Sequence, residues 1–72
     1  AGVRETWLAA LRRVYVGEAV VQRGCAELAA RMEDGCLRQL LAAEADRAAE
    51  RGKRLANLLE KALTTENNLL KW

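Results

Sequence analysis

The sequence contains no histidine, no proline and no phenylalanine, and only three of its 72 residues are aromatic. Histidine most often serves as the general base near neutral pH or as the ligand of a transition metal, so its absence argues against most acid–base and metal enzymes. Alanine and leucine dominate the hydrophobic residues, which make up 51% of the chain. This composition, without proline, is typical of a helical protein. We therefore expect an all-helical chain with no enzymatic activity and no cofactor.

Cysteine is also scarce, and long apolar runs are missing. Cys25 and Cys36 are too few for a disulfide framework and lack the additional ligands of a zinc site. We expect two small, buried or half-buried thiols in a reducing cytosol, too far apart to form a disulfide. The sequence has neither the roughly 18 consecutive apolar residues of a membrane-spanning helix nor a basic-then-apolar leader. These absences predict a soluble, cytoplasmic protein with no membrane partner.

Neither sign of charge is in large excess. The net charge is +2, from 12 basic and 10 acidic residues. Arg12, Arg13 and the basic residues within 47–54 could contact phosphates, but acidic residues interleave with both groups and no recognition motif accompanies them. A charge this small predicts no nucleic-acid partner.

A chain of this length forms one small domain, which we place at residues 1–72. Apolar residues recur at three- and four-residue spacing over residues 3–32, which predicts a long helix with one apolar face. That face comprises Val3, Trp7, Leu11, Val14, Val21, Cys25, Leu28 and Met32, with Glu18 at its one polar position. The β-branched run 14–21 also fits a pair of strands around Gly17. The helical phase on both sides of this run favours the helix.

Residues 36–63 show the same periodicity and predict a second helix. Its face comprises Leu37, Leu41, Glu44, Ala48, Arg51, Leu55, Leu58 and Ala62. Residues 33–35 separate the two segments, with Asp34 as a turn residue and Gly35 as the stop of the first helix. The predicted fold is all-α, an antiparallel hairpin of two long helices.

The end of the chain interrupts this pattern. Two threonines and two asparagines follow Leu63, and both residue types favour caps and turns over helix interiors. We therefore expect the second helix to end near Leu63. The segment 66–72 is apolar again at its end, and it either begins a short third helix or folds back over the helix end.

The predicted hairpin sets a register that brings particular residues together. With the turn centred on residues 34–35, residue i of the first helix lies level with residue 69 − i of the second. Glu18 then faces Arg51, which predicts a buried or half-buried ion pair that fixes the register. Gly17 lies beside Gly52. Because glycine in a helix interior costs about 1 kcal/mol relative to alanine, two facing glycines predict a close approach of the backbones.

A single hairpin has only one seam, which buries too little surface to offset the conformational entropy of ordering the chain. Seven large apolar residues lie off the predicted seam and would face water in a monomer. They are Leu8, Tyr15, Val16, Val20, Leu40, Leu59 and Leu63. Such a patch usually marks a partner surface. We expect a homodimer that forms a four-helix bundle, or docking on another helical protein.

The run RVYVGEAVV at residues 13–21 resembles the first metal-binding helix of ferritin-like di-iron carboxylate proteins. It is most similar to the demethoxyubiquinone hydroxylase branch, in which an arginine, an apolar residue and Gly-Glu open that helix. The resemblance extends over residues 7–63 and implies a four-helix fold with Glu18 as an iron ligand. The second helix of that family carries Glu-x-x-His, and the nearest matches here begin at Glu44 and Glu50.

Neither match has the histidine, because Arg47 and Lys53 occupy its position. A cation there would repel a metal ion and pair with the carboxylate, so the resemblance implies the fold and argues against the activity. Our first hypothesis is a non-enzymatic helical oligomerisation or interaction module. The alternative is a metal-binding or redox protein that uses Glu18 with Glu44 or Glu50 of both subunits, since carboxylates alone can hold a hard divalent cation.

Overall fold

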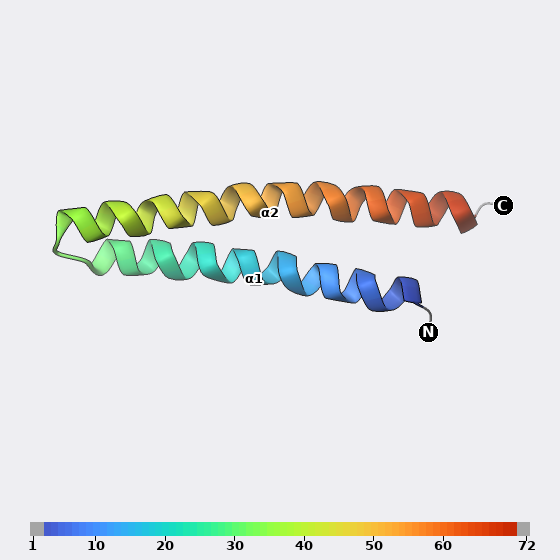
Figure 1. Ribbon diagram of the computed structural model, residues 1–72, viewed down its shortest axis with the longest axis horizontal. Helices are drawn as coiled ribbons and strands as arrows, with labels where there is room; N and C mark the ends of the chain where they lie inside the picture. The colour runs from blue at the N-terminus through green and yellow to red at the C-terminus, as the bar shows by residue number, and fades with distance from the viewer. Residues whose placement is uncertain (1–2, 71–72) are drawn as a thin grey trace.

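The structure is a computed structural model that describes the backbone of residues 3–70 and the side chains of residues 7–65. It consists of two α-helices, α1 (Val3–Arg31) and α2 (Gly35–Leu70), and has no strand in the described residues. The helices run antiparallel, so the beginning of α1 and the end of α2 lie at the same end of the molecule, opposite the turn (Figure 1). The predicted helical hairpin is therefore confirmed, and the strand alternative for residues 14–21 is wrong.

Hydrogen bonds at the turn fix where one helix ends and the next begins. The Asp34 carboxylate accepts a hydrogen bond of 2.9 Å from the backbone N–H of Leu37, which makes Asp34 the N-cap of α2. Gly35 is the first residue of α2 and does not have a positive φ angle. The prediction that Gly35 stops the first helix is therefore wrong, because α1 ends at Arg31 and the chain reverses before Gly35.

A side chain of α2 satisfies the open end of α1. The Arg38 guanidinium donates two hydrogen bonds to the backbone carbonyl of Met32, from Nε at 3.0 Å and from Nη2 at 2.6 Å. The last carbonyl groups of a helix have no partner within the helix, so a cation there replaces lost hydrogen bonds and complements the helix dipole. Asp34 and Arg38 thus bond both helices to the same short turn.

The predicted interruption near Leu63 is wrong, because α2 continues without a break to Leu70. The Thr64 hydroxyl donates a hydrogen bond of 2.9 Å to the carbonyl of Glu60, one turn earlier. In this way a threonine inside a helix satisfies its own polar group without capping or ending the helix. The residues for which we predicted a third helix or a fold-back therefore belong to α2 as far as Leu70, and residues 71–72 lie outside the described residues.

The seam between the helices follows alternating three- and four-residue steps in α2 and steps of three, four or seven residues in α1, as expected for two helices that pack lengthwise. It is formed in α1 by Leu8, Leu11, Glu18, Cys25 and Ala29, directly after α1 by Met32, and in α2 by Leu41, Ala45, Ala48, Gly52, Leu55, Leu59 and Ala62. The buried hydrophobic residues among those described are Leu8, Ala29, Ala45 and Ala48. Three of these four are alanines, so the core of one hairpin is small.

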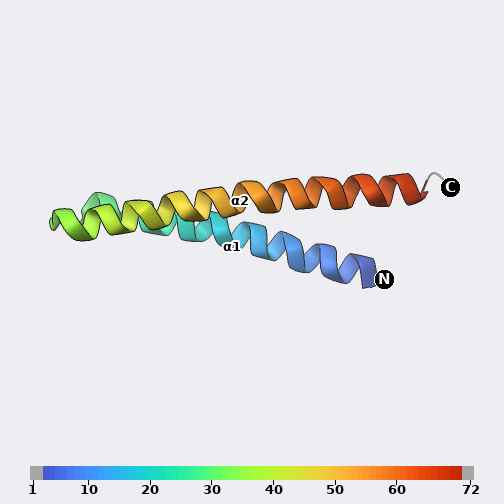
Figure 2. The same ribbon diagram turned by 45° about the horizontal axis from the view of Figure 1, so that its top comes forward.

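The molecule is a thin, elongated layer. The Cα atoms extend over 58 × 19 × 12 Å with a radius of gyration of 16.6 Å, whereas a compact chain of this length has a radius of about 11 Å. The helices cross near the turn and separate toward the other end (Figure 2). One layer of two helices leaves both of its broad sides uncovered, and any site must lie on one of them.

Candidate functional site

The predicted ion pair between the helices is present. Arg51 Nε donates hydrogen bonds to both carboxylate oxygens of Glu18, at 2.5 and 3.1 Å. The Glu18 side chain is only 16% exposed, and that of Arg51 is 43% exposed. The hydrogen bond to Glu18 raises the pKa of Arg51 above its ordinary value, so the guanidinium stays charged wherever the protein is folded. This pair confirms the register in which residues whose numbers sum to 69 lie level.

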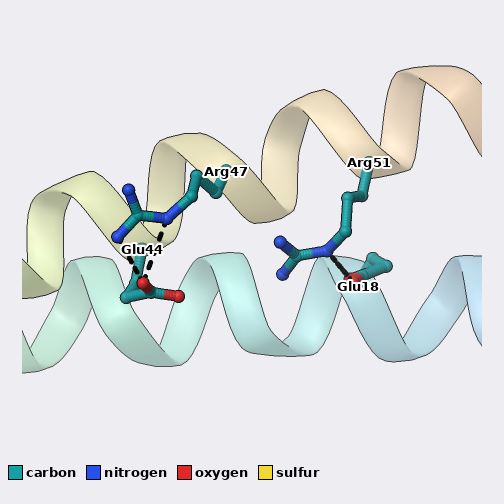
Figure 3. A network of polar contacts seen from close by, with 4 residues as sticks. All are labelled: Glu18, Glu44, Arg47 and Arg51. Carbon is teal, nitrogen blue, oxygen red and sulfur yellow. Dashed lines mark hydrogen bonds and ion pairs between the residues drawn. The ribbon is translucent and has the colours of Figure 1, made fainter.

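Two further ion pairs lie within α2, at the Glu-x-x-Arg and Glu-x-x-Lys sequences that begin at Glu44 and Glu50. Arg47 donates hydrogen bonds from Nε, at 3.0 Å, and from Nη2 to Glu44. Lys53 Nζ lies 3.3 Å from a carboxylate oxygen of Glu50. Figure 3 shows the Glu44–Arg47 and Glu18–Arg51 pairs one after the other along the helices. The expectation that a cation replacing the histidine pairs with its carboxylate is confirmed at both motifs.

The candidate metal ligands are therefore neutralised one by one and not gathered around a common point. Glu18, Glu44 and Glu50 each face a basic side chain of α2. Among the described residues, no group of three or more acidic or cysteine side chains lies close enough together to hold a metal ion. Within one hairpin, each of these three carboxylates forms an ion pair with a basic side chain.

The predicted close approach of Gly17 and Gly52 is wrong. A Cβ atom added to either glycine would meet no atom within 4 Å outside its own stretch of helix. The two helices approach each other at alanines such as Ala45 and Ala48, which are buried in the seam.

The cysteines differ from each other in their environment. Both are free thiols, and Cys25 is half-buried in the seam as predicted. Cys36 is exposed in the first turn of α2, where we had expected at least partial burial. The reason is its place directly after the N-cap, on a side of α2 that no other described element covers.

The seven predicted interface residues fall into three groups. Leu8 is buried, with 8% exposed, because it packs in the seam, so its assignment to the outer surface is wrong. Leu59 is half-buried in the same seam. The other five are exposed as predicted, namely Tyr15, Val16, Val20, Leu40 and Leu63.

The most extensive exposed apolar rows were missed because we had assigned them to the seam. In α1, Trp7, Val14, Val21 and Leu28 follow one another every seven residues and are 43–54% exposed. In α2, Leu37 and Leu58 are 48% and 54% exposed, and they belong to a row that continues at the same spacing through Glu44 and Arg51. We call these two rows together the apolar face. Heptad spacing signals a helix contact, but it does not say which helix is contacted.

Both rows lie on the same side of the layer. Each row precedes seam residues by one position: Leu28 precedes Ala29 in α1, and Glu44 precedes Ala45 in α2. Because the helices are antiparallel, an equal rotation around each helix moves both rows toward the same broad side. The opposite side has a shallow hollow that is lined mainly by small residues, including Ala48, Ala49 and Gly52. The two sides of the layer therefore differ, and the apolar face carries the large side chains.

Comparison with models of known families, with characterised proteins and with solved structures found no match to this chain. The resemblance to ferritin-like proteins therefore stays a prediction that rests on the residues quoted for it. No helix within the described residues is both long enough and apolar enough to cross a membrane. The features of the described residues that bear on function are the apolar face and the charged residues within it.

Proposed function

We propose that this chain is a non-enzymatic helical association module and that the apolar face is its association surface. The observation that carries the proposal is the exposure of six large apolar side chains on one side of the layer, while the hairpin itself buries only Leu8 and three alanines among its described hydrophobic residues. An apolar patch that joins two elements and is bordered by charges usually marks a contact with another protein. Two such layers packed face to face would form a four-helix bundle.

The accessible surface of the chain supports the same proposal. The hairpin exposes 5789 Å², whereas a compact folded protein of 8.0 kDa exposes about 4,450 Å². The excess of about 1,300 Å² per chain is what an obligate dimer interface covers on each partner. Covering it would supply the hydrophobic stabilisation that the alanine-rich seam lacks.

The chemistry of the remaining groups is compatible with this role. The candidate metal ligands form ion pairs, and the two cysteines are free thiols. Free thiols persist in reducing compartments, which supports a cytoplasmic location as part of the proposal. An association module requires no reactive side chain, because shape, apolar area and charge placement are sufficient for binding.

The proposal is tested by measuring the molar mass in solution by light scattering, for the wild type and for two matched variants. Leu28→Glu places a charge on the apolar face. Val20→Glu places the same charge on the side of α1 that faces away from α2, where Val20 is 65% exposed. We expect the wild type and Val20→Glu to be larger than a monomer and Leu28→Glu to be a monomer. A wild type that is monomeric and unfolds cooperatively would overturn the proposal.

A further inference from the structure

The α2 row of the apolar face is complementary to itself when read in the opposite direction. Its members are Leu37, Glu44, Arg51 and Leu58, at intervals of seven residues. Reversal of the row places leucine against leucine and glutamate against arginine. A two-fold contact brings a surface against its own reversed copy, so this row has the charge pattern of such a contact.

The centre of the α2 row lies level with Val21 of the α1 row. In the register set by the Glu18–Arg51 pair, Glu44 lies level with residue 25 of α1 and Arg51 lies level with residue 18. The midpoint of these two levels falls between Val21 and Gln22. Leu37 and Leu58 are level with residues 32 and 11, and their midpoint is the same. A two-fold axis through this point therefore places Val21 against its own copy and Val14 close to Leu28 of the second copy.

We infer that the partner of the apolar face is a second copy of this chain, which packs face to face with its turn at the opposite end. This inference rests on the proposed function. The two-fold axis lies in the interface, perpendicular to the helices, and passes beside Val21. In this arrangement α1 packs against α1 of the second copy through Val14, Val21 and Leu28. In the same way, α2 packs against α2 of the second copy.

The charges favour this arrangement over the other two-fold one. If both turns lay at the same end, α2 would pack against α1 of the second copy. Glu44 and Arg51 would then face a row made of valine, leucine and tryptophan, and the charges would lose water without gaining a partner. With the turns at opposite ends, the row of charges faces its own reversed copy.

The ion pairs already present within each chain would become part of a larger network. Arg51 bonds to Glu18 through Nε, which leaves its two terminal nitrogens available for a second acceptor. Glu44 of the second copy would lie opposite that guanidinium and would keep its own bond to Arg47. Each half of the interface then contains a network in which Glu18 and Arg51 of one copy continue into Glu44 and Arg47 of the other. Acidic and basic side chains alternate in this network, and none of these four charges lacks a partner.

The experiment is disulfide cross-linking of single-cysteine variants under mild oxidation. Cys25→Ala and Cys36→Ala remove the native thiols, and light scattering first establishes that this background is dimeric. In it, we expect Val21→Cys to form a covalent dimer about tenfold faster than Val20→Cys, because only the first holds two thiols at high effective concentration. Val20→Cys is the matched control, since the same residue type is replaced one position away.

A mixing experiment then establishes the direction. Val14→Cys and Leu28→Cys should each cross-link slowly alone, and should rapidly form the mixed dimer, identified by mass, when the two proteins are combined. Rapid self-linking of Val14→Cys would overturn the inferred direction. If the background is a dimer but Val21→Cys links no faster than its control, the inference fails and the proposed function stands. If the background and the wild type are both monomers, both fail.

Discussion

At the scale of single residues, Glu18 is the most protected of the ion-paired carboxylates that the structure describes. Its side chain is 16% exposed, compared with 49% for Glu44 and 65% for Glu50. A charge that has lost most of its water depends more on its partner, because the local dielectric is lower and salt screens the pair less. The pair that links the helices should therefore contribute more to folding than the exposed pairs within α2.

We predict that Glu18→Gln lowers the free energy of unfolding more than the matched variant Glu50→Gln. The exposed Glu50–Lys53 pair should contribute about 0.2–1 kcal/mol. The pKa of Arg51 is raised, so its stabilising effect is complete below its ordinary pKa and is lost only as the pH rises through the folded-state value, far above neutral. Urea unfolding at neutral pH, without salt and at about 1 M NaCl, measures both variants. Equal losses for the two would contradict the prediction.

From the sequence, we predicted correctly those contacts between the helices that follow from the register alone. Glu18 and Arg51 occupy the polar positions of two apolar faces, so any antiparallel hairpin with this turn brings them level. Gly17 and Gly52 are also level, but whether two residues touch depends on how each helix is rotated about its axis. Periodicity gives the register to within a residue and leaves that rotation open.

At the scale of the helices, the turn is held by one side chain directly before α2 and one within its first turn. Asp34 caps the start of α2 and Arg38 bonds to the last carbonyl of the α1 end. Both side chains act on backbone groups that would otherwise lack partners, and both lie within five residues of the chain reversal. The antiparallel register therefore depends on local chemistry as well as on the seam.

We predict that Asp34→Ala destabilises the protein by about 1 kcal/mol, because the N–H of Leu37 loses its acceptor. Asp34→Asn is the matched control, since asparagine caps a helix about as well as aspartate, and its stability should stay close to that of the wild type. Thermal and urea unfolding followed by far-UV circular dichroism give both values. If the asparagine variant were as unstable as the alanine variant, the charge of Asp34 and not its hydrogen bond would be what matters.

The sequence could not decide which of two apolar rows faces the other helix. In α1, the row of Leu11, Glu18 and Cys25 is flanked on one side by large residues such as Val21 and on the other by small or polar residues such as Ala29. We predicted that the larger row would be buried. The structure buries the smaller one, because alanines let the helix axes approach and interlock. The same rotation leaves the larger residues free for a second contact.

At the scale of the whole molecule, one hairpin has the proportions of half a bundle. Its Cα atoms extend over only 12 Å in the smallest dimension, compared with 58 Å in the largest. Globular domains are built from two or more packed layers around a shared core, and the described part of this chain forms one layer. The second layer, in our proposal, is another copy, so folding and association are one process.

This coupling predicts that the melting temperature rises with protein concentration. For a dimer that unfolds into two chains, each tenfold dilution removes about 1.4 kcal/mol of stability per dimer. With an unfolding entropy of about 2.1 cal/mol/K per residue, the melting temperature should fall by about 4–5 °C for each tenfold dilution. Circular dichroism melts of the wild type and of Val20→Glu should both show this shift. Leu28→Glu should lose most of its helical signal at concentrations at which the wild type is folded, because its apolar face has no partner and folding is coupled to association. A wild type whose melting temperature is the same at every concentration would show that the single layer is stable alone.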